Sequence, residues 1–408
     1  MVLQSANHDW LAGLAATTVV AAAGSLALGP RGGVVRAAAV AANDYFDEAD
    51  IERARRYERP QRALHAANAA VAAATLALLV RLRAGTALRR RSAAIAAADG
   101  AALSLALTIA GLPLGSLARK RALEAGIATQ SWRGWAVDVV RGGALGASFT
   151  GGGAAAVRLL MISAGERWWL AAAAGSTAVM IVGTFAAPIL LDPIFNDFTP
   201  LPPGELRSSV LEIADRAGVT VSEVFSVDAS RRTSQVNAYV GGIGATRRIV
   251  LFDTLLSSFS AAQTSVVVAH ELAHVRHNDV PRGLLFASIV TLPGAYAVAR
   301  LAERIDAVIG RSEPTTLPAL ALAGAIVATF VGPFASRLSR SVERRADGLA
   351  LELTDDAEAL IAFEQQITGS NLADPDPPRW RSLLFASHPP AVERIGAAVA
   401  YAAARQPG

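Results

Sequence analysis

Seven long apolar segments dominate the chain, and polar stretches separate them. A helix needs roughly 20 apolar residues to cross about 30 Å of hydrocarbon. The segments that meet or approach this length are Trp10–Gly29, Ala63–Val80, Ala93–Leu112, Gly142–Ala164, Trp168–Leu191, Gly283–Ala299 and Thr315–Ser336. We therefore predict a mainly α, polytopic membrane protein with about seven transmembrane helices.

The stretch between the fifth and sixth apolar segments has a mixed, soluble pattern. Glu205–Ala217 repeats its apolar residues with helical spacing, and Val224–Val227 is a short β-prone run. Two further β-prone runs, Gln235–Val240 and Arg248–Phe252, flank a glycine-rich turn, which is typical of a β-hairpin. We expect a small domain here that contains a β-hairpin or sheet.

Helical patterns also precede the sixth apolar segment and follow the seventh. Ser260 and Gln263 have the spacing of a capping box, which predicts a helix that runs on to His277. After the seventh segment, Arg337–Thr354 also has a helical pattern.

These patterns divide the chain into two domains. Residues 1–191 are predicted to form an N-terminal membrane domain of about five spans. Residues 192–408 form a second domain, which includes the last two spans.

Composition supports the membrane assignment and narrows the chemistry. The 408 residues are 52% hydrophobic, and a positive mean hydropathy of +0.37 is rare in soluble proteins. No cysteine is present, which excludes disulfides and thiolate chemistry, so any metal must be held by histidine and carboxylate groups. Lys120 is the only lysine among the 38 basic residues, and with the alanine richness this indicates a bacterial source.

The basic residues flank the apolar segments, so they favour anionic lipid over nucleic acid as their partner. No lysine or arginine precedes the first span, whereas the loop after it holds seven arginines. The second loop also has five arginines, yet the balance places the N-terminus outside and the first loop inside. With seven spans, the stretch 192–282 and the C-terminal tail are then cytoplasmic.

One acidic residue, Asp99, lies inside the third predicted span. An acid within the membrane is by default a hypothesis for a functional site. A lone acid is more often hydrogen-bonded between helices, and we favour that interpretation.

The run HELAH at residues 270–274 carries the clearest chemistry. On a helix, His270 and His274 are four residues apart and lie on one face, where both imidazoles can reach a single ion. Zn²⁺ suits such N and O donors, and Glu271 beside it can take a proton from the attacking water. The alternative is a surface helix with two solvated histidines, which the rest of the site makes less plausible.

A catalytic zinc site needs a third protein ligand. We select Glu343, on the helix that continues out of the seventh span, with Asp347 four residues later on the same face. Asp347 would accept the other ring N–H of a ligating histidine and so orient it. Without the HELAH run, this pair would be read as solvated acids among arginines. His277 is also near, but we favour for it a role as a cation at the helix C-terminus over that of a ligand.

Five segments carry a resemblance to a known family. They are DPIFNDFTPL (192–201), NAYVGGIGATRRIVLFDTLL (237–256), HELAHVRHND (270–279), SRSVERRAD (339–347) and SHPPAVERI (387–395). These segments resemble the type I CAAX prenyl endopeptidases, which are seven-span membrane zinc proteases. The five N-terminal spans are similar to that family only in outline.

The resemblance implies one zinc ion held by His270, His274 and Glu343, in a zincin-like cytoplasmic domain with Glu271 as catalytic base. It implies that Asn237 binds the substrate backbone, which fits an exposed strand edge that pairs with an extended peptide. Alone, Asn237 would equally be a turn residue at a strand end.

Further roles follow for the C-terminal segment. By the same resemblance, His388 lies near the active site and can donate to the oxyanion that forms when water attacks the carbonyl. Without the resemblance, it would be read as loop structure. We expect Arg394 to anchor its segment by hydrogen bonds rather than to react.

The expected activity is a zinc-dependent endopeptidase that hydrolyses membrane-associated or lipidated proteins or peptides at the cytoplasmic face. A bacterial source makes prenylated substrates unexpected. A heat-shock-type membrane quality-control metalloprotease is the closest alternative, although that type usually has about four spans. A seven-span transporter and a catalytically silent scaffold are alternatives of other classes, but the first gives the paired histidines no role and the second conflicts with the intact HELAH run.

Overall fold

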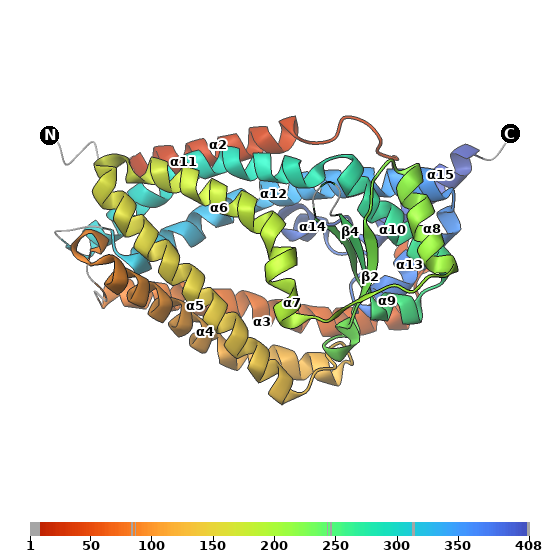
Figure 1. The fold of residues 1–408 in the computed structure, drawn as a ribbon, viewed down its shortest axis with the longest axis horizontal. Coiled ribbons are helices and arrows are strands. Elements are labelled where there is room, and N and C mark those ends of the chain that lie inside the picture. Colours follow the sequence, from red (N-terminus) through yellow and green to blue (C-terminus); the bar gives the residue numbers. More distant parts are fainter. Residues whose placement is uncertain are drawn as a thin grey trace.

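The computed structural model describes residues 9–405, except 83, 84, 86, 243, 245, 246 and 312–314. Seven of its helices are long and apolar enough to cross a membrane, as predicted. They are α2 (Asp9–Ala27), α3 (Glu48–Arg81), α4 (Ala93–Glu124), α5 (Trp132–Ser163), α6 (Trp168–Leu190), α11 (Asp279–Val308) and α12 (Leu317–Thr354). Figure 1 shows them as a long barrel-like frame, with the mixed domain at one end.

Several of these helices extend well beyond their apolar part. The predicted span of α3 begins at Ala63, but the helix begins at Glu48, because its first turns are polar yet still strongly helix-forming. In the same way α12 continues through its polar half to Thr354. These extensions carry membrane helices directly into the mixed domain.

The loops between the long helices gather at two opposite ends. At the end away from the mixed domain, Arg89 Nη2 donates to Gly165 O over 3.1 Å, and Leu88 N donates to Thr315 O over 3.1 Å. At the other end, the loop between α4 and α5 pairs with the mixed domain through the bridge between Ala128 and Thr233. The second, fourth and sixth loops therefore lie at one end, and the third loop lies at the other end with the mixed domain. This alternation is what a chain that crosses a membrane seven times requires.

The mixed domain contains a four-stranded sheet of order β1-β2-β4-β3. Its strands are β1 (Phe198–Pro200), β2 (Glu223–Val227), β3 (Ala238–Gly241) and β4 (Arg248–Phe252). The predicted hairpin is confirmed as the antiparallel pair of β3 and β4, while β2 and β4 are parallel. The three-residue β1 was not predicted. β3 lies at an edge, so one side of its backbone remains free to pair.

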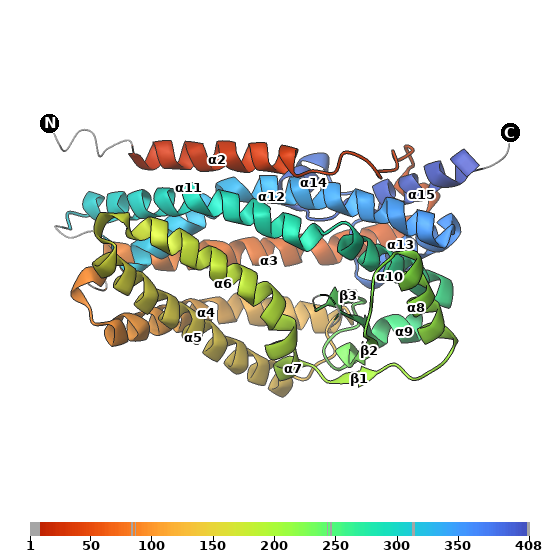
Figure 2. The same ribbon diagram turned by 45° about the horizontal axis from the view of Figure 1, so that its top comes forward.

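Shorter helices complete the domain around this sheet (Figure 2). They are α7 (Asp192–Phe195), α8 (Glu205–Arg216), α9 (Asp253–Ser258), α10 (Ala261–Arg276), α13 (Ala357–Ser370), α14 (Arg379–Phe385) and α15 (Ala391–Arg405). The predicted capping box of Ser260 and Gln263 opens α10. Leu251 of β4, Leu272 of α10 and Ala350 of α12 are fully buried in one core. This packing fixes α10 against α12.

The segment 28–47, which we call the strap, links α2 to α3 by crossing α12 and α15, and its only regular element is the short 3-10 helix η1 (Ala42–Asp44). The Gly33 carbonyl lies directly against Gly348 of α12, and the Ala38 carbonyl lies against Gly396 of α15, where a Cβ would collide with it. Ala38 N also donates to Gly396 O over 2.9 Å. Glycine at 348 and 396 therefore permits this close approach.

Candidate metal centre

Two helices bring two imidazoles and a carboxylate together. His270 and His274 are one turn apart on α10, and their Nε2 atoms lie 3.2 Å from each other. From α12, Glu343 places Oε2 3.2 Å from His270 Nε2 and Oε1 3.6 Å from His274 Nε2. The predicted set His270, His274 and Glu343 thus converges on one point.

A carboxylate orients each histidine. Asp347 Oδ1 lies 2.9 Å from His270 Nδ1, as proposed from the sequence. Asp279 Oδ2 lies 3.0 Å from His274 Nδ1, a contact that the sequence reasoning missed. When each acid accepts an Nδ1–H, both Nε2 atoms are left with a lone pair directed at the common point.

Asp279 reaches His274 because the chain reverses sharply between α10 and α11. Asn278 makes this turn with a left-handed φ of 55°, which asparagine tolerates better than most residues. Asp279 is then the first residue of α11, and it also forms ion pairs with Arg282 and Arg345. This acid is the last residue of the run HND (277–279). Its spacing from the histidines does not show which residue the turn brings into contact with them.

The donor geometry fits a zinc ion. Ligand atoms about 2.0–2.1 Å from a tetrahedral ion are about 3.3 Å from one another. The three separations between His270, His274 and Glu343 are 3.2, 3.2 and 3.6 Å. Two Nε2 lone pairs that face each other also repel unless a cation lies between them. Two imidazoles and a carboxylate form a donor set that Zn²⁺ accepts.

Glu271 lies beside this cluster. Its carboxylate and the ring nitrogens of His270 and His274 are all within 4.8 Å of one another. Glu343 is the carboxylate that contacts the Nε2 atoms of both histidines directly, so it completes the converging donor set. Burial raises the pKa of Glu271 above its usual value, opposed by the neighbouring histidines. A raised pKa makes this carboxylate a stronger proton acceptor than an ordinary glutamate.

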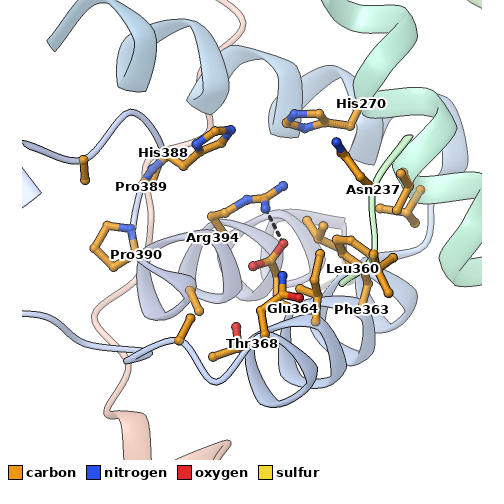
Figure 3. Close-up of a pocket in the computed structure, with 18 of the residues that line it drawn as sticks. Asn237, His270, Leu360, Phe363, Glu364, Thr368, His388, Pro389, Pro390 and Arg394 are labelled. Carbon is orange, nitrogen blue, oxygen red and sulfur yellow. Dashed lines mark ion pairs between the residues drawn. The ribbon is translucent and has the colours of Figure 1, made fainter. Parts of the chain in front are cut away.

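The cluster opens onto a cleft of about 440 Å³. Asn237, His270, Glu271 and His388 line it, and so do residues of α13. In Figure 3, His270 and His388 lie on one side of Arg394, and Glu364 and Thr368 of α13 lie on the other. Asn237 immediately precedes β3, and its Oδ1 accepts the backbone N–H of Ala238 over 2.9 Å. The free edge of β3 and the cluster therefore share one cleft.

His388 stands in the loop before α15, with its side chain 63% exposed. Its Nε2 lies 3.6 Å from Glu343 Oε2, and its Nδ1 lies 2.9 Å from Ser387 Oγ. The ring is thus close to the metal-binding group yet open to the cleft, as a donor to a bound carbonyl would have to be.

Arg394 anchors α15 to the cluster. Its Nε donates to Asp347 Oδ2 over 2.9 Å and its Nη2 donates to Asp347 Oδ1 over 2.6 Å. Its Nη1 lies 2.5 Å from Glu364 Oε1, an ion pair without hydrogen-bond geometry. Glu364 could not be selected from the sequence, because an acid on an amphipathic helix is normally solvated.

Two other residues lie outside the cluster. Asp99 forms an ion pair with Arg91, whose Nε is 3.2 Å from Asp99 Oδ2. Arg91 lies just before the start of α4, the helix that carries Asp99, so this contact is local and differs from the hydrogen bond between helices that we favoured. His277 is the C-cap of α10 and is not among the converging donors.

Comparison with known proteins points to one family. Residues 200–402 match the profile described as peptidase family M48. Residues 35–197 match the profile described as CAAX prenyl protease N-terminal, five membrane helices.

Curated relatives carry related names. The chain is 33% identical over 300 residues to the "Uncharacterized metalloprotease YhfN" of Bacillus subtilis. This match covers 72% of this chain and 70% of that protein. It is 40% identical to "CAAX prenyl protease 1" of Saccharomyces cerevisiae over 114 residues, 28% of this chain and 25% of that protein. For the rice "CAAX prenyl protease 1 homolog", identity is 30%, and the match covers 54% of this chain and 53% of that protein.

A solved structure has the same fold. The crystal structure of S. mikatae Ste24p superposes with a TM-score of 0.76 at 20% sequence identity. The match covers 96% of this chain and 98% of that one, so the likeness includes both the membrane frame and the mixed domain.

Proposed function

This chain belongs to peptidase family M48 and is a membrane metalloendopeptidase, and from that premise we propose that it cleaves membrane-associated or lipidated proteins and peptides. The observation that carries the proposal is the convergence of His270, His274 and Glu343 beside Glu271 in a cleft at the end of the membrane frame. One zinc ion is the proposed cofactor.

The proposed mechanism is hydrolysis of a peptide bond. Zn²⁺ held by these three ligands would supply a Lewis acid that polarises the scissile carbonyl. Glu271 takes a proton from the attacking water and returns it to the leaving amine, which its raised pKa favours. Asp347 and Asp279 hold the two imidazoles in the tautomer that directs both Nε2 atoms at the cluster.

The residues that line the cleft position the substrate. The free edge of β3 can pair with an extended peptide, and Asn237 at its start offers an amide to the same backbone. We assign to His388 the donor that stabilises the developing oxyanion, because its exposed ring faces the cleft beside Glu343.

We place the catalytic end on the cytoplasmic side of a bacterial cell membrane. The support is the excess of arginines after α2, two in the strap and five in the polar part of α3 at the catalytic end, and the bacterial relative. Lipidated or other membrane-associated substrates fit a cluster that adjoins α11 and α12. The membrane quality-control type remains the alternative within the same chemistry.

The test is cleavage of a quenched fluorogenic peptide library by the purified full-length chain loaded with zinc. Glu271→Gln should lower kcat/KM by about 10²-fold or more while zinc content stays near one ion per chain. Glu212→Gln, which changes an exposed carboxyl on α8, is the matched control. Undiminished cleavage in Glu271→Gln, or a chain that retains no zinc, would refute the proposal.

A further inference from the structure

The cleft continues past the metal cluster to an end that α13 and α14 enclose. Glu364, Thr368 and Asn371 follow at the spacing of one helix face, and all three line the cleft. Ser382 of α14 lines it as well. In Figure 3, Glu364 and Thr368 lie beyond Arg394 on the side away from His270. This end is therefore separate from the metal-binding residues and polar along one wall.

Hydrogen-bond acceptors at this end lack donors. Among the described residues, the buried oxygens without a hydrogen-bond partner include Asn371 Oδ1 and Ser382 Oγ, whereas Glu364 Oε1 forms an ion pair with Arg394 Nη1 but no hydrogen bond. The side chain of Glu364 is only 4% exposed, and Ser382 is buried as well. Buried acceptors without partners are unfavourable, so a group with several N–H donors would be bound here in preference to an apolar one.

The charges at this end are also unbalanced. The Arg394 guanidinium directs two of its nitrogens to Asp347, so only Nη1 remains for Glu364. Two carboxylates thus share one cation, which leaves a net charge of about −1 within the trio when both acids are ionised. Burial raises the pKa of Glu364 to about 7, although Arg394 opposes the shift. A second cation beside Glu364 would stabilise its ionised form.

Other parts of the cleft wall are apolar. Val266 and Val267 come from α10, and Leu360, Phe363 and Ile367 come from α13. A cleft that combines apolar walls with polar acceptors matches a side chain that has a hydrocarbon stem and a cationic head. An acidic side chain would meet repulsion from Glu364, and an aliphatic one would leave the acceptors unpaired.

We propose that this end of the cleft is a subsite for a cationic side chain of the substrate, lysine or arginine, with Glu364 as its counter-charge. The inference rests on the proposed peptidase function and adds a substrate class to it. Thr368 and Asn371 offer further oxygens to the same ammonium or guanidinium group.

The experiment measures peptide affinity without turnover. Full-length, zinc-loaded Glu271→Gln protein is titrated with fluorescent decapeptides that carry either lysine or the uncharged norleucine at one position, moved along the peptide. At one position, lysine should lower Kd by about tenfold or more, as expected for a charge-assisted contact in a buried site. Adding Glu364→Gln should abolish that difference and leave norleucine peptides bound as before.

Glu358→Gln is the matched control, because it removes an exposed carboxyl from the first turn of the same helix. The preference for lysine should survive it. Equal affinity for lysine and norleucine peptides at every position would overturn the subsite, and this comparison needs no variant at Glu364. A lysine preference that persists in Glu364→Gln would overturn it too.

Cleavage by the unsubstituted chain separates this inference from the function on which it rests. If neither peptide is cleaved while the lysine preference in binding stands, the peptidase proposal fails and the subsite does not. If both peptides are cleaved and bound equally, the subsite fails and the peptidase proposal does not.

Discussion

At the scale of single residues, the contact of Asp279 with His274 has a measurable consequence for the metal. Asp279→Asn removes the charged acceptor of the His274 ring N–H, so zinc affinity should fall by roughly 10- to 100-fold in competition with a chelator. Asp376→Asn, at an exposed position, is the control. Unchanged zinc affinity in a folded Asp279→Asn chain would show that the contact does not orient the ligand.

A second residue-scale prediction concerns Glu364 and pH. Its folded-state pKa of about 7 lies above the usual value of 4.5, so the native state binds this proton more tightly than the unfolded state. Stability from Glu364 is therefore present below about pH 4.5 and is lost as pH rises toward 7, by an amount on the order of a few kcal/mol. The charged groups around it include Arg394, Asp347, His270 and Glu343.

Glu364→Gln removes this dependence. The difference in Tm between Glu364→Gln and the unsubstituted chain should therefore increase in favour of the variant from pH 5 to pH 8. The slope with pH is the readout, because any constant packing effect of the amide cancels. A difference that does not change with pH contradicts the raised pKa.

At the scale of elements, the strap should be sensitive at the glycines it crosses. Gly348→Ala places a Cβ against the Gly33 carbonyl, so either the strap or α12 must shift, at a cost of about 1–3 kcal/mol. A fall in Tm of several degrees is the expected result. Gly332→Ala, in the same helix with open space around it, should instead leave Tm unchanged or raise it slightly.

Equal Tm values for the two alanine variants would show that the strap is not packed against α12. Zinc affinity should be measured alongside, since Gly348 follows Asp347 directly. A shift at Gly348 that loosens Asp347 should weaken zinc binding, whereas Gly332→Ala should not.

The elements that hydropathy controls could be predicted from sequence. The seven spans, the hairpin of β3 and β4, and the start of α10 follow from local patterns, and the structure confirms them. β1 could not, because three residues carry no periodicity and are held by pairing with β2. The strap could not either, since its contacts join residues more than 300 positions apart.

The candidate site could also be predicted only in part. The spacing of His270 and His274 is local, and it identified the helix that carries the cluster. Asp279 and Glu364 were missed because their roles arise from a reversal after α10 and from the packing of α13 beside α15. Such contacts depend on tertiary structure, which a single sequence does not display.

At the scale of the whole molecule, the proposed orientation can be tested with single cysteines, because the chain contains none. Glu212→Cys lies in the mixed domain and Glu166→Cys lies in the loop before α6, and both positions are exposed. In intact cells, a membrane-impermeant maleimide should label Glu166→Cys only. Glu212→Cys should react once the membrane is permeabilised, and the reverse pattern would refute the orientation.

The strap also bears on the order in which the molecule is built. A ribosome completes the strap early, but Gly348 and Gly396, against which it packs, are synthesised near the end. Arg394, which holds Asp347 against His270, emerges equally late. The strap therefore cannot dock until α12 and α15 have been made. Until then the orienting contacts of the histidines are incomplete, so a nascent or truncated chain lacks the geometry for peptide cleavage.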